Sequence, residues 1–455
     1  MGLFFYTKKG SIISTVDLPT TEIIEPKNSR IREFFYSLKN LIYNNGKDLR
    51  GMKVEKNSLK LLASRAVNKL GDVLYDYGNS SWIASMGSFG QKMLGIYQIV
   101  EVVIAIILNP FGGAIADRFR RRKILLWTDG LCALLCVILA FIPSNRLMLY
   151  GLILANMLLA VSNAFSSPAY RAYVPEVVKK EKLVSYNSYL ETSVQIIKVS
   201  SPLLGFLIYH YFGIRWTLIV DSLTFGISFL CLLMIRHVDY VGHEIRQNLI
   251  FREILKDIWE GFLYIVAQKE IFFLLIMATT VNLFLAMLTY LLPFSSSIFK
   301  MSSAYATLLS LSAVGSIFGA IVSKRVPNTI SALLWALGFS GLGITVLAIS
   351  PLTGLPIFLS FSGVLFYSLF ETIFNIHFFS QVQSRVANEY MGRVISSIYT
   401  LAILFMPLGT LMMTLIRSSI SAYSFIIIGL AVFLLAMVGL YYSNKRLKLS
   451  HEKEG

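Results

Sequence analysis

Acidic residues inside long apolar runs are the first candidates for chemistry in this sequence. Lys69, Asp72 and Asp76 fall at helical spacing within the first apolar run, and Glu101 lies deep in the next one. Ionisable side chains are costly in hydrocarbon, so residues of this kind usually serve a function. A carboxylate near the middle of a membrane could bind and release a proton, and Glu101 is the strongest single candidate. Asp72 also has a structural interpretation, because Lys69 could neutralise it.

Two later runs carry similar residues. Glu191 and Lys198 are seven residues apart and share a helix face. They could pair with neighbouring helices, bind a charged substrate, or exchange partners during a conformational cycle. Glu371 and His377 lie in another run, and histidine gains or loses a proton near physiological pH, although a lone histidine is more often a satisfied polar residue. The candidates for proton coupling or substrate binding are therefore Asp72, Asp76, Glu101, Glu191, Lys198, Glu371 and His377.

A short basic loop separates the second and third apolar runs. Within residues 109–123, Gly113 is followed four residues later by Asp117-Arg118, and then by Arg121 and Arg122. A glycine allows two helices to approach closely. Asp117 could cap a neighbouring helix end, and the arginines offer forked donors to carboxylates or lipid phosphates. The simpler alternative is a juxtamembrane anchor without a further role.

The other polar residues of these runs have structural interpretations. We expect Asp129 to join the charges of the basic loop, and Asp221 either to cap a helix end or to take part in function. Cys132, Cys136 and Cys231 all fall inside apolar runs, without the spacing of a metal site or a disulfide framework. No cofactor or metal is therefore expected.

Helices that cross a membrane must position these residues. The 455 residues are 55% hydrophobic and 15% charged, and the mean hydropathy is +0.66. Apolar runs of about 20 residues, enough to cross hydrocarbon as a helix, recur along the chain. We predict an all-α membrane protein with about twelve transmembrane helices. The predicted spans are 60–86, 93–115, 123–143, 147–170, 185–209, 214–236, 270–297, 302–323, 330–350, 353–383, 391–416 and 419–443.

The placement of the net charge of +16 predicts the topology. Basic residues gather in alternate loops, as the positive-inside rule requires of cytoplasmic loops, and this places both termini in the cytoplasm. The excess charge therefore reports membrane orientation, and no nucleic-acid partner is expected. The basic loops hold Arg118, Arg120, Arg121, Arg122, Lys123, Lys179, Lys180, Lys182, Arg246, Arg252, Lys256, Lys324, Arg325, Arg385 and Arg393.

The spans divide into two pseudo-symmetric six-helix halves. The predicted division is a cytoplasmic tail at 1–56, a first half at 57–236, a linker at 237–268, a second half at 269–443 and a cytoplasmic tail at 444–455. Residues 29–43 form either a basic amphipathic helix on the membrane surface or a weakly ordered tail. Residues 244–266 have the periodicity of a surface helix. Gly319 and Ser323 repeat the spacing of Gly113 and Asp117, with the acid lost.

The basic loop resembles the loop signature of the major facilitator superfamily. Segments 167–188, 257–264 and 383–394 are similar to the macrolide-efflux and siderophore-exporter branch of that family. The resemblance runs from about residue 60 to residue 443. It implies a substrate cavity near the bilayer midplane between the halves. It also implies a conformational-switch loop formed by Gly113, Asp117, Arg118, Arg121 and Arg122.

The leading hypothesis is a secondary active transporter of the cell membrane that works by alternating access and exports amphiphilic, drug-like or macrolide-like molecules in exchange for protons. Uptake or export of a specific metabolite or siderophore is the second hypothesis. A non-transporting membrane sensor or scaffold is a third, although a scaffold has little reason to retain buried carboxylates. The sequence has neither a Walker phosphate loop nor a nucleophile elbow, so we do not expect an enzyme. The expected partners are a small-molecule substrate, protons and membrane lipids, and the expected state is a monomer.

Overall fold

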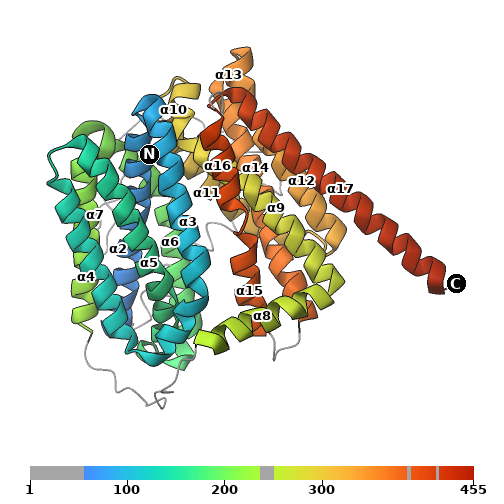
Figure 1. The fold of residues 1–455 in the computed structure, drawn as a ribbon, viewed down its shortest axis with the longest axis horizontal. Coiled ribbons are helices and arrows are strands. Elements are labelled where there is room, and N and C mark those ends of the chain that lie inside the picture. Colours follow the sequence, from blue (N-terminus) through green and yellow to red (C-terminus); the bar gives the residue numbers. More distant parts are fainter. Residues whose placement is uncertain (1–55, 236–250, 387–390, 417–419, 455) are drawn as a thin grey trace, which may run out of the picture. The chain divides into compact units, whose positions relative to one another are not determined.

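The structure, a computed structural model, describes residues 56–235, 251–386, 391–416 and 420–454. All regular elements within these ranges are helices (Figure 1). The first six long helices follow one another through short connections, and a 3-10 turn, η1 (Lys180–Lys182), precedes the fifth of them. They are α2 (Lys56–Ala84), α3 (Gly87–Arg118), α4 (Arg121–Ala140), α5 (Asn145–Val177), α6 (Leu183–Phe212) and α7 (Ile214–Leu233).

The second set of helices begins with α8 (Phe251–Ala267), which runs across the ends of the others in Figure 1. The helix α8 falls within the segment 237–268, whereas residues 29–43 and 244–250 lie outside the described ranges. The remaining elements are α9 (Lys269–Leu291), η2 (Leu292–Phe294), α10 (Ser295–Ile298), α11 (Ala304–Ser323), α12 (Ile330–Val346), α13 (Ile349–Thr353), α14 (Ile357–Arg385), α15 (Met391–Ala402), α16 (Met406–Leu415) and α17 (Ala422–Glu454).

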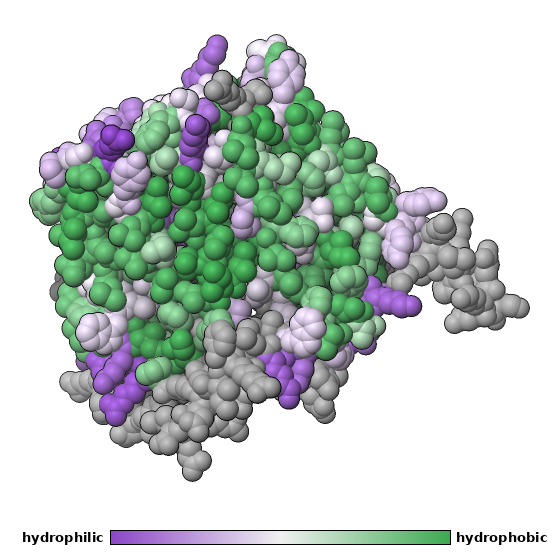
Figure 2. Space-filling model, viewed as in Figure 1, coloured by the Kyte–Doolittle hydropathy of each residue, from purple (hydrophilic) through white to green (hydrophobic). Residues whose placement is uncertain are grey.

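The predicted all-α membrane fold is confirmed. Eleven helical segments of the described chain are long and apolar enough to cross a membrane. The helix α2 is not among them, because Lys60, Arg65, Lys69, Asp72 and Asp76 lower its hydropathy. However, α2 has 29 residues, which is long enough to span, and it packs against α6 and α7. On the face shown in Figure 2, apolar side chains cover the middle and hydrophilic ones lie at the upper and lower edges.

The predicted span at 391–416 is broken into two helices. Pro407 is the second residue of α16, and proline has no N–H to donate and clashes with the carbonyl four residues earlier. The break frees carbonyl groups at the end of α15, which side chains of α9 satisfy. Thr279 Oγ1 donates to Leu401 O (3.2 Å), and Asn282 Nδ2 donates to Ala402 O (3.0 Å). Side chains of a neighbouring helix thus stabilise the irregular backbone, as a membrane interior requires.

In each half, a glycine allows two helices to pack closely, and the two helix pairs occupy corresponding positions. A Cβ atom on Gly112 would lie 2.1 Å from Ala164 O, so α3 and α5 are in backbone contact there. A Cβ atom on Gly319 would lie 2.4 Å from Leu369 O, which places α11 and α14 in the same relation. The close helix approach predicted at Gly319 is therefore confirmed, whereas in the first half the observed contact is at Gly112, next to the predicted Gly113.

Candidate functional site

A cavity of about 890 Å³ lies between the two halves. The first half contributes residues of α2, α3 and α6, and the second half contributes residues of α9, α11 and α14. Five of the seven sequence-predicted residues line it: Asp76, Glu101, Glu191, Lys198 and Glu371. Residues that are up to 295 positions apart in the chain therefore face one space.

The ionisable residues of this cavity are open to it. Asp76, Glu101, Glu191 and Lys198 are exposed, although each sits on a membrane-spanning helix, so their charged groups face the cavity rather than packed protein. Glu191 accepts from Gln195 Nε2 (2.6 Å), one turn further along α6. An amide one helical turn away holds the carboxylate in place without neutralising its charge.

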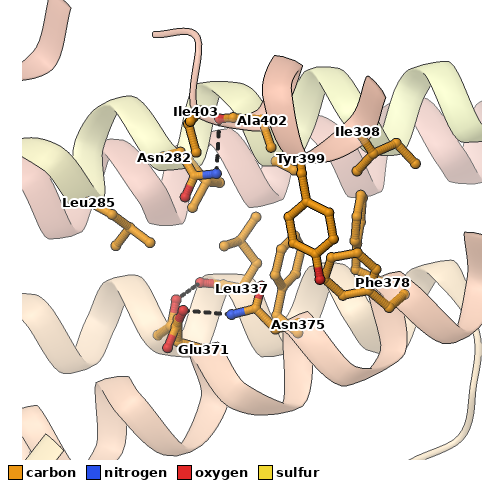
Figure 3. Close-up of a pocket in the computed structure, with 15 residues that line it drawn as sticks. Asn282, Leu285, Leu337, Glu371, Asn375, Phe378, Ile398, Tyr399, Ala402 and Ile403 are labelled. Carbon is orange, nitrogen blue, oxygen red and sulfur yellow. Dashed lines mark hydrogen bonds between the residues drawn. The ribbon is translucent and has the colours of Figure 1, made fainter. Parts of the chain in front are cut away.

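Glu371 has the same arrangement on the opposite wall. Asn375 Nδ2 donates to Glu371 Oε1 (2.6 Å). Both residues also line a second, smaller cavity of about 150 Å³ between α9, α12, α14 and α15 (Figure 3). Figure 3 shows the Asn375–Glu371 bond on one side of this space and the Asn282–Ala402 bond of the broken helix on the other. Glu371 therefore separates the central cavity from the region of the α15–α16 break.

Glu101 stands at a junction between two cavities. Besides the central one, it lines a cavity of about 720 Å³ formed by α3, α5 and α15. The other lining residues include Asn109, Arg171 and Ala172, which lie toward the ends of α3 and α5 that carry the basic loops. The side chain of Glu101 is therefore accessible both from the central cavity and from the cavity that leads toward the basic loops.

Aromatic residues connect the two halves at the other end of the central cavity. Tyr77 of α2 and Tyr305 of α11 are stacked with ring centroids 4.9 Å apart. Tyr290 of α9 donates to the backbone oxygen of Gln91 in α3 (2.9 Å). Sequence reasoning did not identify these contacts, because an aromatic residue in an apolar run gives no sign of which helix it meets.

The structure places Asp72 and His377 outside the central cavity. Lys69 Nζ lies 3.3 Å from Asp72 Oδ2, which agrees with the structural interpretation of Asp72. His377 is buried on α14, where its ring nitrogens lie 3.2 Å from Asn328 Oδ1 and 3.2 Å from Ser323 O. These two residues therefore do not share a binding surface with the other five.

The two remaining acids lie inside the first half. Asp129 accepts from Asn68 Nδ2 (3.1 Å) and from Ser228 Oγ, so it joins α2, α4 and α7. The expectation that it joins the basic loop was wrong, because amide and hydroxyl donors nearer in the bundle satisfy it. Asp221 is fully buried and accepts from Cys136 Sγ (3.2 Å), which gives it a place in the helix core rather than at a helix end.

The basic loop ties three helices together. Gly113, Asp117 and Arg118 lie in the last turns of α3, and the side chains of Asp117 and Arg118 are outside the described part of the chain. Arg121 contacts Glu176 on α5 (Nη1 to Oε1, 2.5 Å). Arg122 donates to the carbonyl oxygens of Leu232 (3.1 Å) and Leu233 (2.8 Å), the last residues of α7. Cations suit this position, because the last carbonyl groups of a helix have no partner within it.

Comparison with known proteins agrees with this geometry. Residues 72–402 match the family model of the Major Facilitator Superfamily. Macrolide efflux protein A of Enterococcus faecalis is 23% identical over 314 residues, which cover 67% of this chain and 94% of that protein. The staphyloferrin A transporter of Staphylococcus aureus is 24% identical over 390 residues, which cover 82% of this chain and 93% of that protein.

Solved structures show the same fold. A bacterial homologue of the iron transporter ferroportin in its inward-facing state superposes with a TM-score of 0.65 at 15% identity, over 86% of this chain and 99% of that one. A bacterial homologue of ferroportin in an outward-facing state gives a TM-score of 0.54 at 16% identity, with the same coverage. Because the family model spans most of the sequence and the fold agrees with it, this chain belongs to the major facilitator superfamily and is a multi-pass membrane transporter of a small molecule.

Proposed function

We propose that this protein is a secondary transporter that exports amphiphilic molecules, with a preference for cations, in exchange for protons. The observation that carries the proposal is the central cavity, which has four carboxylates, one lysine and aromatic walls between the two halves. The efflux function in the name of the macrolide relative supports the direction of transport.

The size and surface of the cavity suit an amphiphile. Its volume of about 890 Å³ is in the upper part of the range that holds drug-sized ligands. Tyr77, Tyr97 and Tyr305 offer broad apolar faces with a hydroxyl group at one edge, and Leu309 and Ile317 add aliphatic surface. Such walls gain free energy by covering apolar substrate surface, and they set few directional demands on it.

The charge of the cavity favours a cationic substrate. Asp76, Glu101, Glu191 and Glu371 face it together with a single cation, Lys198. An anionic substrate would have to approach this excess of acids at short range, where repulsion is weakly screened. A cationic substrate can replace the protons that neutralise the same carboxylates. Competition between substrate and protons for one set of acids is the simplest basis for exchange.

Alternating access requires one end of the cavity to be closed while the other is open. The stacked Tyr77–Tyr305 pair and the Tyr290–Gln91 bond close the end far from the basic loops. The cavity beyond Glu101 extends toward the basic loops, which the positive-inside rule assigns to the cytoplasm. The higher TM-score to an inward-facing transporter supports the same interpretation. In the opposite state, the halves would separate at the tyrosines and meet at the basic loops.

The membrane orientation can be tested by cysteine labelling. Ser88 and Lys324 are both exposed and lie at opposite ends of the spans. In intact cells, Ser88→Cys should react with an impermeant thiol reagent, whereas Lys324→Cys should react only after the membrane is opened. The parent chain gives the background, since Cys132 and Cys136 are buried and Cys231 is partly exposed. Labelling of Lys324→Cys alone in intact cells would reverse the orientation.

Substrate flux in sealed vesicles tests the function directly. The purified protein should export an amphiphilic dye with a fixed positive charge when a pH gradient is applied, and transport a matched sulfonate dye at least about tenfold more slowly, the factor expected from a difference of about 1.4 kcal/mol. Glu191→Gln should narrow this preference, because it removes one of the four acids. Equal transport of both dyes, or faster transport of the sulfonate, would refute cation preference. Absence of pH-driven flux for either dye would refute proton exchange.

A further inference from the structure

A second polar site lies where α14 meets the connection between α11 and α12. Gln381 of α14 donates from Nε2 to Asn328 O (2.6 Å) and to Asn328 Oδ1 (2.9 Å). Asn328 also donates from Nδ2 to Ser380 Oγ (2.9 Å). His377, one turn earlier on α14, contacts Asn328 Oδ1 and Ser323 O. His377 and Gln381 are buried, with 6% and 4% of their surface exposed.

The donors and acceptors of this network have a fixed order. A backbone carbonyl can only accept, so the Gln381 atom that faces Asn328 O is the amide nitrogen. Arg385 confirms this orientation from the other side, since its guanidinium can only donate and it contacts Gln381 Oε1. The same Gln381 nitrogen faces the side chain of Asn328, so the Asn328 atom there is its oxygen. Turning the Asn328 amide over would place two donors against each other.

This order determines the state of the histidine. His377 Nδ1 faces Asn328 Oδ1, and Nε2 faces the backbone oxygen of Ser323, so both partners are acceptors. A neutral imidazole has one donor and one acceptor nitrogen and can satisfy only one of them. We infer that His377 is a proton-binding site, whose doubly protonated ring fastens the α11–α12 connection to α14. This site lies apart from the central cavity, and the inference does not depend on what that cavity transports.

The surroundings of the ring suit a positive charge. Ser323 is the last residue of α11, and the carbonyl end of a helix attracts cations. Pro327, four residues later, has no backbone N–H to donate to Ser323 O. The partners of this oxygen are therefore the N–H of Val326 (3.1 Å) and the ring of His377. The charged side chains on the surrounding elements are Lys269, Glu270, Lys324, Arg325, Glu371 and Arg385. In the described part of the chain, no carboxylate lies within 4.0 Å of the ring, so carbonyl oxygens hold the charge.

Water can reach the partners of the ring. Asn328, Gln381 and Arg385 line a cavity of about 670 Å³ at the end of the second half that carries Arg325 and Arg385. Loss of one ring proton would remove the ring donor from either Asn328 Oδ1, which would keep Gln381 Nε2, or Ser323 O, which would keep the N–H of Val326. The α11–α12 connection should then detach from α14 more easily, so its exposure should rise with pH.

Thiol labelling of this connection tests the inference without a transport assay. In the full-length protein in lipid nanodiscs, the labelling rate of Lys324→Cys is divided by that of Ser88→Cys, which removes the ionisation of the thiol itself. Between about pH 5 and about pH 9, on either side of the usual range of a histidine side chain, the ratio should rise about tenfold, the change expected when one hydrogen bond to a charged group is lost. In His377→Gln the ratio should be high and independent of pH. His210→Gln, at a histidine near the other end of the bundle, should leave the rise intact.

A second measurement covers the case in which His377→Gln does not fold. Replacing His210, His237, His243 and His451 by glutamine leaves His377 as the single histidine, and its ring nitrogens can be observed by nitrogen-15 NMR. At the lower pH, both nitrogens should be protonated. A neutral tautomer there would overturn the inference, as would a labelling ratio that is flat in the parent chain or that still rises in His377→Gln.

Discussion

Glu101→Gln is expected to lower the substrate ratio that a pH gradient can maintain by about tenfold for each unit of the gradient. Each proton exchanged per substrate contributes about 1.4 kcal/mol per pH unit, which corresponds to a factor of ten in concentration. A glutamine at position 101 removes one group that can carry such a proton. Asp76→Asn should have the same effect, because Asp76 faces the same cavity. The ratio would be measured in sealed vesicles that contain the purified variant.

Downhill flux distinguishes a coupling role from a structural one. Glutamine has nearly the shape of glutamate, so Glu101→Gln should still pass substrate down its own gradient. Asp72→Asn is the matched control for Asp76→Asn, because both residues are carboxylates of α2 but Asp72 pairs with Lys69 outside the cavity. It should keep the full pH-driven ratio. A full ratio in both Glu101→Gln and Asp76→Asn would assign coupling to Glu191 or Glu371 instead.

The sequence predicted the fold and part of the candidate site for the same physical reason. Hydrocarbon tolerates neither unpaired backbone groups nor isolated charges, so long apolar runs must be helices and their charged residues must avoid lipid. A charge that avoids lipid can face a cavity, as Glu101 does, or neighbouring helices, as Asp129 does. Periodicity shows on which face of its own helix a residue lies. It does not show which other helix packs against that face. This is why Asp129 was assigned to the wrong network.

Contacts between helices were beyond the reach of the sequence pattern. Pro407 could have suggested the break between α15 and α16, but the donors that stabilise the break, Thr279 and Asn282, come from another helix more than 100 residues away. The contact between the halves beside the cavity likewise depends on pairs such as Tyr77 with Tyr305. These pairs arise from the packing of the two halves, which a single sequence does not encode in its spacing.

Gly95→Leu should open the cavity at its tyrosine-lined end. Gly95 of α3 packs against Thr414 of α16, and a Cβ atom there would lie 2.0 Å from Thr414 Oγ1 and 2.8 Å from its Cγ2. Threonine is branched at Cβ and has little freedom to move away. Overpacking costs about 1–3 kcal/mol. The state in which α3 and α16 are in contact should therefore become about 5-fold to about 150-fold less populated, relative to the state in which they are apart.

Accessibility from outside the cell measures this shift. Ser316 lines the central cavity, and Ser316→Cys should be protected from an impermeant thiol reagent in the parent chain and react in Gly95→Leu. Gly226→Leu is the matched control, since a Cβ atom on Gly226 would meet nothing within 4 Å. It should leave Ser316→Cys protected. Gly95→Leu should also lose most substrate export, because a cycle that cannot close this end does not return the cavity to the cytoplasm. Equal protection in the two leucine variants would show that the α3–α16 contact does not control access.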